Sequence, residues 1–222
     1  MSRDDFRIIF DWDGVLIDSS RQHKESWSRL AREINKQLPP GFFNKSFGMK
    51  NEKIIMEILF WADDISEAHE LGLRKEIHYR QIIQEKGISF LPGVEIFIKR
   101  LRIANIPFVI GSSTQRVNID TVLDLLHFNG YFDKIVSAED VTAGKPDPQV
   151  FIKSAQLLGN PAPKCVVFED ALVGIEAARA ANMKVVAVTT TNPRSVLQDK
   201  SDIVVDRLDE VTIERLNGLF ST

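Results

Sequence analysis

Short, continuous runs of apolar residues are the feature of this sequence that most restricts its fold. Four are well defined, at residues 7–10 (RIIF), 107–111 (PFVIG), 164–168 (KCVVF) and 184–188 (KVVAV). Two weaker runs lie at residues 134–138 (KIVSA) and 202–205 (DIVV). Runs this short, rich in β-branched residues and without an alternating polar face, are typical of strands covered on both faces. They predict a parallel β-sheet.

The segments between the later runs have the spacing of helices. Apolar residues recur at helical intervals over residues 115–128 and 147–159, and an alanine-rich segment covers residues 172–183. Strands and helices therefore alternate along this part of the chain. The alternation predicts an α/β fold with a doubly wound parallel sheet.

The first strand breaks this alternation. The next convincing strand begins only at residue 107, whereas the connection between two parallel strands needs about a dozen residues. The intervening chain has helical patterns over residues 19–38, 51–61 and 65–85. We therefore expect an α-helical domain at residues 19–91, inserted into an α/β core domain formed by residues 1–18 and 92–222. Its hinges are expected at residues 19–20 and 90–93.

Composition argues against several classes of function. The 222 residues carry a formal net charge of -3 and a pI of about 5.9, so there is no general basic field for nucleic acids or anionic membranes. No apolar stretch approaches the roughly 20 residues that span a bilayer, and the first residues lack the pattern of a signal peptide. The single cysteine, Cys165, is expected to be a buried thiol. We expect a cytoplasmic protein, a monomer or a small homo-oligomer.

Acidic and hydroxyl side chains collect where the predicted strands end. They are Asp11 and Asp13 after the first strand, Ser112, Ser113 and Thr114 after the strand at 107–111, and Glu169 and Asp170 after the strand at 164–168. The carboxyl ends of parallel strands lie at one edge of a sheet, where ligands bind. Four unpaired carboxylates in one cleft raise one another's pKa values. A hard divalent cation removes this conflict, and oxygen ligands without histidine or cysteine favour Mg²⁺.

A positive charge is expected at the same edge. Lys145 follows the weak strand at 134–138 and precedes two prolines, which end the loop and begin the next helix. Each residue alone has a simpler interpretation: Asp11 is a turn residue, and Lys145 is a solvated lysine. Likewise, Ser112 or the pair Glu169-Asp170 is a helix cap. Their joint occurrence at the ends of successive strands favours a functional site.

The same residues resemble the motifs of a known family. Residues 11–19 (DWDGVLIDS) are similar to the first motif of the haloacid dehalogenase-like superfamily of phosphoryl-transfer enzymes. Ser112 resembles the second motif, Lys145 the third, and residues 168–178 (FEDALVGIEAA) the fourth. The order and spacing match over nearly the whole chain. The helical insertion resembles the cap of the group that contains β-phosphoglucomutase and phosphoglycolate phosphatase.

The resemblance implies covalent catalysis. Asp11 would attack a phosphate ester and form an aspartyl-phosphate, which divides one difficult step into two. Asp13 would protonate the leaving oxygen and then activate water. An alkoxide needs this proton and a halide does not, so Asp13 favours phosphate esters over carbon–halogen bonds.

The resemblance also implies where a cation and a phosphate would bind. The cation ligands would be the Asp11 carboxylate, the Asp13 carbonyl and Asp170, with Glu169 close by. The phosphate would contact Ser112 and Lys145, with Ser113 and Thr114 beside them. Such groups act by positioning the phosphate and stabilising its charge.

Three residues of the predicted helical domain match functional positions of the β-phosphoglucomutase group. They are Gly48 in SFGMK, Lys75 in LRKEIHY, and His23, whose counterpart is thought to hold the acid/base aspartate. For His23, packing at the domain junction is the structural alternative. Two further segments are given mainly structural interpretations. Residues 189–193 (TTTNP) predict a turn, with a loop at the rim of the site as the alternative, and Phe60 and Trp61 are expected in the core of the helical domain.

The chain departs from that group where the group binds a second phosphate. The group's arginine is Asn51 here, and its lysine–asparagine pair is Gln115-Arg116, for which Arg116 or Lys50 would have to compensate. We therefore expect a Mg²⁺-dependent phosphatase of a small phosphorylated metabolite, a sugar phosphate or a phosphoglycolate-like compound, with Arg116 among the substrate-binding residues. A β-phosphoglucomutase-like mutase is the alternative, and a catalytically silent metabolite-binding protein is the remote one.

Overall fold

The computed structural model describes residues 6–46 and 48–221 and contains a six-stranded parallel sheet. The strands are β1 (Arg7–Phe10), β2 (Phe108–Gly111), β3 (Ile135–Val136), β4 (Cys165–Glu169), β5 (Lys184–Val188) and β6 (Ile203–Val205). Their order is β3-β2-β1-β4-β5-β6, and every neighbouring pair is parallel. All six apolar runs therefore form strands, as predicted.

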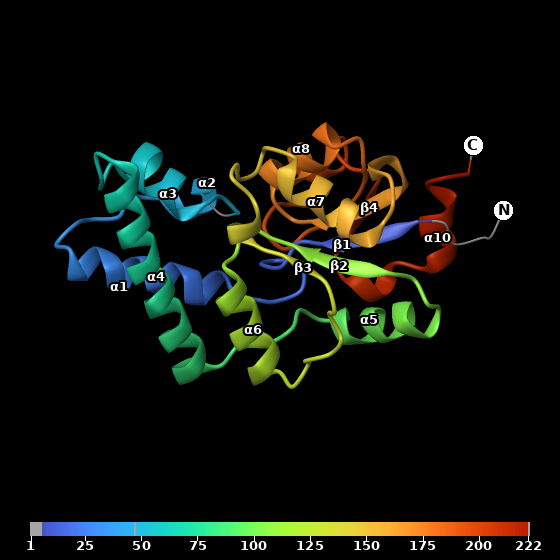
Figure 1. Ribbon diagram of the computed structural model, residues 1–222, viewed down its shortest axis with the longest axis horizontal. Coiled ribbons are helices and arrows are strands. Elements are labelled where there is room, and N and C mark those ends of the chain that lie inside the picture. The colour runs from blue at the N-terminus through green and yellow to red at the C-terminus, as the bar shows by residue number, and fades with distance from the viewer. Residues whose placement is uncertain (1–5, 47, 222) are drawn as a thin grey trace.

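Helices cover both faces of the sheet (Figure 1). One layer contains α7 (Gln149–Leu158), α8 (Leu172–Ala180) and α9 (Arg194–Leu197); the other contains α5 (Val94–Ile103), α6 (Arg116–Leu125) and α10 (Ile213–Gly218). Short 3₁₀ turns lie at η2 (Ala138–Asp140), η3 (Ala162–Lys164) and η4 (Leu208–Glu210). Within β1, Ile9 packs into the first apolar layer, whereas Ile8 and Phe10 pack into the second. The doubly wound α/β fold is confirmed.

Between β1 and β2 the chain forms a helical insertion at one end of the sheet, opposite the two termini (Figure 1). It consists of α1 (Ser20–Glu33), α2 (Phe42–Ser46), α3 (Asn51–Lys53), the π-helical segment η1 (Ile54–Leu59) and α4 (Ile65–Lys86). The two chain segments that join it to the sheet run side by side: the Asp18 N–H donates to the Ser89 carbonyl (3.1 Å), and the Leu91 N–H donates to the Leu16 carbonyl (3.0 Å).

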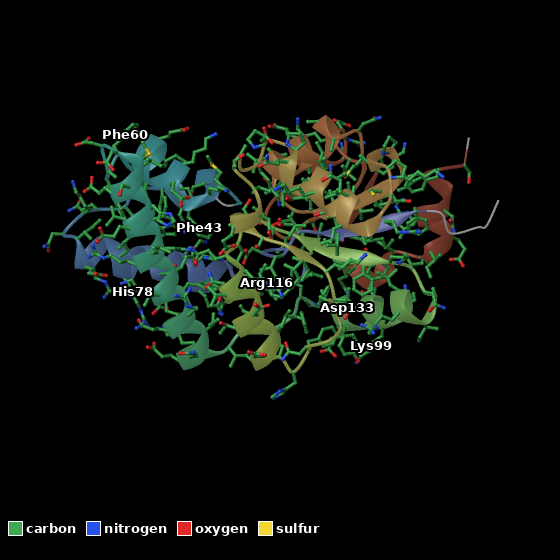
Figure 2. All side chains as sticks on the ribbon, in the orientation of Figure 1. Phe43, Phe60, His78, Lys99, Arg116 and Asp133 are labelled. Carbon is green, nitrogen blue, oxygen red and sulfur yellow. The ribbon has the colours of Figure 1, made fainter. Side chains whose placement is uncertain are left out.

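The insertion has its own apolar core, and the prediction that Phe60 belongs to this core is wrong. Trp27, Ile55 and Trp61 are buried together in this core. Phe60 is instead 76% exposed and lies at the outer end of the insertion (Figure 2). The reason is local: Phe60 ends η1 in the left-handed conformation (φ 51°), which turns its side chain away from the core that Trp61 enters.

Two expectations from composition can also be compared with the structure. Cys165 is a buried free thiol at the start of β4, as predicted. Over the described ranges 6–46 and 48–221, no helix is both long enough and apolar enough to cross a membrane.

Candidate active site

The strand order determines where the predicted site residues meet. β1 lies between β2 and β4, with Phe10 opposite Ile110 on one side and Phe168 on the other. The residues that follow these three strands therefore share one edge of the sheet, at a point where the strand order reverses. The structure brings together there Asp11, Asp13, Ser112, Glu169 and Asp170, all of them buried.

Three of these carboxylates form a group suited to a metal ion. Asp11, Glu169 and Asp170 each offer an oxygen, and the three oxygens lie within 4.8 Å of one another. Oδ1 of Asp170 is buried and has no hydrogen-bond partner among the residues described. Burial raises the pKa of Asp170 well above its usual value, and Glu169 and Asp11 raise it further. A divalent cation would bind the unpaired oxygen and stabilise the ionised carboxylates. A donor set made only of oxygen fits Mg²⁺.

Lys145 is part of the same cluster and is not a solvated lysine. Its side chain is 1% exposed, and Nζ lies 2.8 Å from Asp11 Oδ1 and 2.6 Å from Glu169 Oε1. Although burial alone would lower the pKa of Lys145, the two carboxylates raise it above its usual value. Burial raises the pKa of Asp11 to about 7, against the opposing effect of Lys145. A bound cation would therefore favour the ionised form of Asp11.

Glu169 supports this cluster through both of its oxygens. Oε1 accepts from Lys145, and Oε2 accepts from the backbone N–H groups of Asp170 (2.7 Å) and Ala171 (2.8 Å). Glu169 and Asp170 do not cap α8, whose N-cap is Ala171; Glu169 instead accepts from the two backbone N–H groups just before that helix. A Cβ at Gly174 would lie 1.6 Å from Glu169 Oε1, so only glycine leaves room for this side chain.

Asp170 is held by residues that the sequence had not indicated. The Thr191 hydroxyl donates to Asp170 Oδ2, and the Asn192 amide donates to the Asp170 carbonyl (2.9 Å). Residues 189–193 form a turn, as predicted, but that turn also fixes a proposed metal ligand. The available signal was a hydroxyl and an amide directly after β5, the neighbour of β4. Gly14 approaches from the other side with φ +78°, and a Cβ there would lie 2.0 Å from Asp170 Oδ2.

Asp13 faces the helical insertion and is held by three donors. Ser19 Oγ donates to Asp13 Oδ1 (2.5 Å), His23 Nε2 lies 3.0 Å from the same oxygen, and the Thr114 hydroxyl donates to Oδ2. Although burial raises the pKa of Asp13, His23 and the hydrogen bonds from Ser19 and Thr114 lower it to about 2. Thr114, expected beside the phosphate, thus uses its hydroxyl to position Asp13.

His23 both packs at the junction and orients Asp13. Its ring stacks on Tyr79, with centroids 4.2 Å apart, and its Nδ1 lies 2.8 Å from Lys75 Nζ. An ammonium group can only donate, so Nδ1 accepts and Nε2 carries the proton that His23 donates to Asp13. Lys75, expected to bind substrate, therefore sets the tautomer of His23.

A cavity of about 250 Å³ lies between the sheet edge and the insertion. Its lining includes Ser112, Ser113 and Thr114 from the loop after β2, and Gly48, His23 and Lys75 from the insertion. Gly48 has φ +84°, a backbone conformation that favours glycine. The volume lies below the usual range for drug-sized ligands and suits a compact metabolite.

Arg116, expected among the substrate-binding residues, lies outside this lining. Its Nε is 2.9 Å from Asp120 Oδ1, one helical turn along α6, and the side chain is exposed (Figure 2). An i,i+4 pair of opposite charges on a helix surface holds both side chains along the helix. In this arrangement the Arg116 guanidinium is paired with Asp120 and does not line the cavity.

Comparisons with known proteins agree with this geometry. A family model described as haloacid dehalogenase-like hydrolase matches residues 8–188. The chloroplastic 5-amino-6-(5-phospho-D-ribitylamino)uracil phosphatase of Arabidopsis thaliana is 37% identical over 96% of this chain, which spans only 57% of that relative's length. The β-phosphoglucomutase of Bacillus subtilis is 29% identical over 95% of this chain and 93% of its own.

A solved structure has the same architecture. A HAD (haloacid dehalogenase-like) hydrolase of family IA, variant 3, from Entamoeba histolytica matches with a TM-score of 0.87 and 27% identity. The match covers 96% of this chain and 98% of the other. Together with the family model, it spans the sheet, the insertion and all four motif regions. The chain therefore belongs to the haloacid dehalogenase-like hydrolase family.

Proposed function

We propose that this chain is a Mg²⁺-dependent phosphatase that hydrolyses the ester of a small phosphorylated metabolite through an aspartyl-phosphate on Asp11. The observation that carries this proposal is the buried cluster of Asp11, Lys145, Glu169 and Asp170 next to the cavity. A phosphate in the cavity would meet Asp11 as the nucleophile. Lys145, which is not part of the lining but lies 2.8 Å from Asp11 Oδ1, would supply a fixed positive charge beside it. We further propose that residues 19–91 act as a cap domain over a core of residues 1–18 and 92–222.

The proposed reaction has two steps. In the first, an Asp11 oxygen attacks phosphorus, the bond from phosphorus to the alcohol oxygen breaks, and Asp13 donates its proton to that oxygen. In the second, Asp13 takes a proton from water, the water oxygen attacks phosphorus, and inorganic phosphate leaves Asp11. Mg²⁺ bound by Asp11, the Asp13 carbonyl and Asp170 would supply positive charge that offsets the phosphate and the carboxylates.

The surroundings of Asp13 suit this exchange of a proton. Its lowered pKa favours the ionised form, which is the form that accepts a proton from water in the second step. A phosphate dianion bound beside Asp13 raises that pKa and favours the protonated form needed in the first step. His23, Ser19 and Thr114 hold the carboxyl group in place in both forms.

Hydrolysis is favoured over a mutase reaction by the residues at the expected second-phosphate positions. Asn51 donates from Nδ2 to Glu76 (2.7 Å), and Arg116 pairs with Asp120. Neither presents a cation to the cavity. The phosphatase name of the relative that is 37% identical supports the same conclusion.

Removing Mg²⁺ is expected to abolish activity. The purified protein should hydrolyse p-nitrophenyl phosphate with Mg²⁺, lose that activity in excess EDTA, and recover it when Mg²⁺ is restored, because the cluster of carboxylates needs a cation before a phosphate can approach. Release of p-nitrophenol, followed by absorbance, measures this. Activity that is undiminished in excess EDTA contradicts the proposal.

Thr191→Val is expected to weaken Mg²⁺ binding about tenfold, the lower end of the effect of residues that orient metal ligands. Without the hydroxyl, the Asp170 carboxylate loses the donor that fixes its rotamer. Isothermal titration of the substrate-free protein with Mg²⁺ alone measures the affinity. Thr189→Val is the matched control, because the Thr189 hydroxyl bonds Asp206 instead (2.6 Å). Equal affinities in the two variants would refute the role of Thr191.

A further inference from the structure

Beyond the proposed phosphate site, the cavity is lined by more acidic than basic side chains. Among the described residues these are Glu52, Glu76 and Glu139 against Lys50 and Lys75, together with His69. The leaving group of a substrate would lie on this side. The charge that the leaving group can carry therefore depends on which of these side chains are free to contact it.

Both lysines are already bound to the protein. Lys50 Nζ donates to the carbonyls of Ala138 (3.1 Å) and Val141 (2.7 Å), which ties the insertion to the loop after β3. Lys75 Nζ donates to His23 and to Glu76 (2.8 Å), and its side chain is almost completely buried. Each lysine would have to give up existing hydrogen bonds to approach a second anion.

Glu76 holds the Lys75 side chain in place. Its carboxylate also accepts from Asn51 (2.7 Å) and from Asn118 of α6 (2.6 Å), so this buried group accepts from three residues of the insertion and the core. A buried carboxylate with this many partners holds its counterion firmly. Lys75 is thus neutralised within the protein.

A helix N-terminus on this side of the cavity already has a carboxylate of the protein as its partner. The N-terminus of α6 follows Gln115, which lines the cavity, and a helix N-terminus attracts anions. Both oxygens of Glu139 accept from the Arg116 N–H at that terminus (3.2 and 3.1 Å). Glu52, half-buried and 2.9 Å from His69, adds a second carboxylate to the lining.

We propose that Glu139, supported by Glu52, makes this cavity selective for an uncharged, hydroxyl-rich leaving group and against a second phosphate or a carboxylate. This inference rests on the proposed phosphatase function and narrows its substrate class. Carboxylates accept hydrogen bonds from hydroxyl groups and repel anions at short range. The substrate class is then the phosphate monoesters of neutral sugars and polyols, and phosphoglycolate-like compounds and sugar bisphosphates are excluded.

Matched pairs of phosphate esters test this selectivity. 2-Hydroxyethyl phosphate and phosphoglycolate differ only in a hydroxymethyl or a carboxylate group, as do glycerol 3-phosphate and 3-phosphoglycerate. We expect kcat/KM to be about tenfold or more higher for the neutral member of each pair, because like charges in contact are strongly disfavoured. For a compound that is turned over too slowly, its inhibition constant against p-nitrophenyl phosphate hydrolysis is compared with that of its partner, which gives the ratio of their binding affinities.

Glu139→Gln tests whether this carboxylate is responsible. The glutamine oxygen can still accept from Arg116, and the charge is gone, so the preference for the neutral member should fall at least about threefold. Glu95→Gln is the control, since Glu95 pairs with Lys99 on the exposed face of α5 and should leave the ratio unchanged. A ratio between two compounds measured on one preparation does not depend on how much of the variant is folded.

The outcomes separate this inference from the proposed function. The selectivity is overturned if kcat/KM for the anionic members equals or exceeds that for the neutral members, or if the ratio of the two is unchanged in Glu139→Gln. In either case hydrolysis of p-nitrophenyl phosphate continues. Failure to hydrolyse p-nitrophenyl phosphate as well as every ester overturns the phosphatase function itself.

Discussion

Replacing Asp11 by asparagine should abolish phosphatase activity, with a loss of about 10⁴-fold or more, in the range seen when a covalent nucleophile is removed. The amide has nearly the same shape as the carboxyl group, but it cannot form an acyl-phosphate. Stability should not fall. Asp11 lies beside Glu169 and Asp170, and without a cation its burial raises its pKa to about 7, so a neutral side chain removes repulsion. Lys145 keeps Glu169 as its partner.

A rapid acid quench measures the intermediate directly. Wild-type protein mixed with substrate labelled in the phosphate should retain label that hydroxylamine releases, as expected for an acyl-phosphate, and Asp11→Asn should retain none. Asp120→Asn is the matched control, because Asp120 pairs with Arg116 on the surface of α6 and should leave both label and turnover unchanged. The expected residual turnover of Asp11→Asn is about 0.01% of the wild-type value. A residual turnover above about 1% would show that another residue is the nucleophile.

The sheet and the strand-end residues were predictable because both depend on local sequence. A buried parallel strand needs a short apolar run, and the residue after it lies at the ligand-binding edge whatever the rest of the chain does. Asp11, Ser112 and Asp170 could therefore be placed together before their neighbours were known. The helix α5 also had a signal in the sequence, since its buried residues Val94 and Leu101 are seven positions apart, as on one face of a helix. We nevertheless did not predict it.

Contacts between distant segments were not predictable in the same way. Thr191 reaches Asp170, and Glu139 reaches the backbone of Arg116, only because adjacent strands bring their loops together. Periodicity gives the face of a helix or strand, not the height at which two loops meet. The position of Arg116 is different, because its i,i+4 spacing to Asp120 was a signal in the sequence itself.

Asp13→Asn is expected to slow the hydrolysis of an alkyl phosphate by about 10²- to 10⁴-fold, the usual contribution of a general acid or base. The amide oxygen can still accept from Ser19 and His23, and the Thr114 hydroxyl, which donates to the other oxygen in the wild type, can rotate to accept from the amide NH2, so the local geometry should persist. For p-nitrophenyl phosphate the first step should be nearly normal, because p-nitrophenolate leaves without a proton. The second step should remain slow, because no group is left to take a proton from water.

The two substrates together make this prediction specific to proton transfer. With p-nitrophenyl phosphate, Asp13→Asn should release p-nitrophenol in a burst equal to the enzyme concentration and then turn over slowly, because the aspartyl-phosphate on Asp11 accumulates. With an alkyl phosphate no burst should appear, because the first step is already slow. Stopped-flow absorbance measures the first case and quenched-flow release of the alcohol the second. Equal losses for both substrates without a burst would indicate that Asp13 only positions its neighbours. The proposed division of labour between Asp11 and Asp13 requires that the two substrates differ.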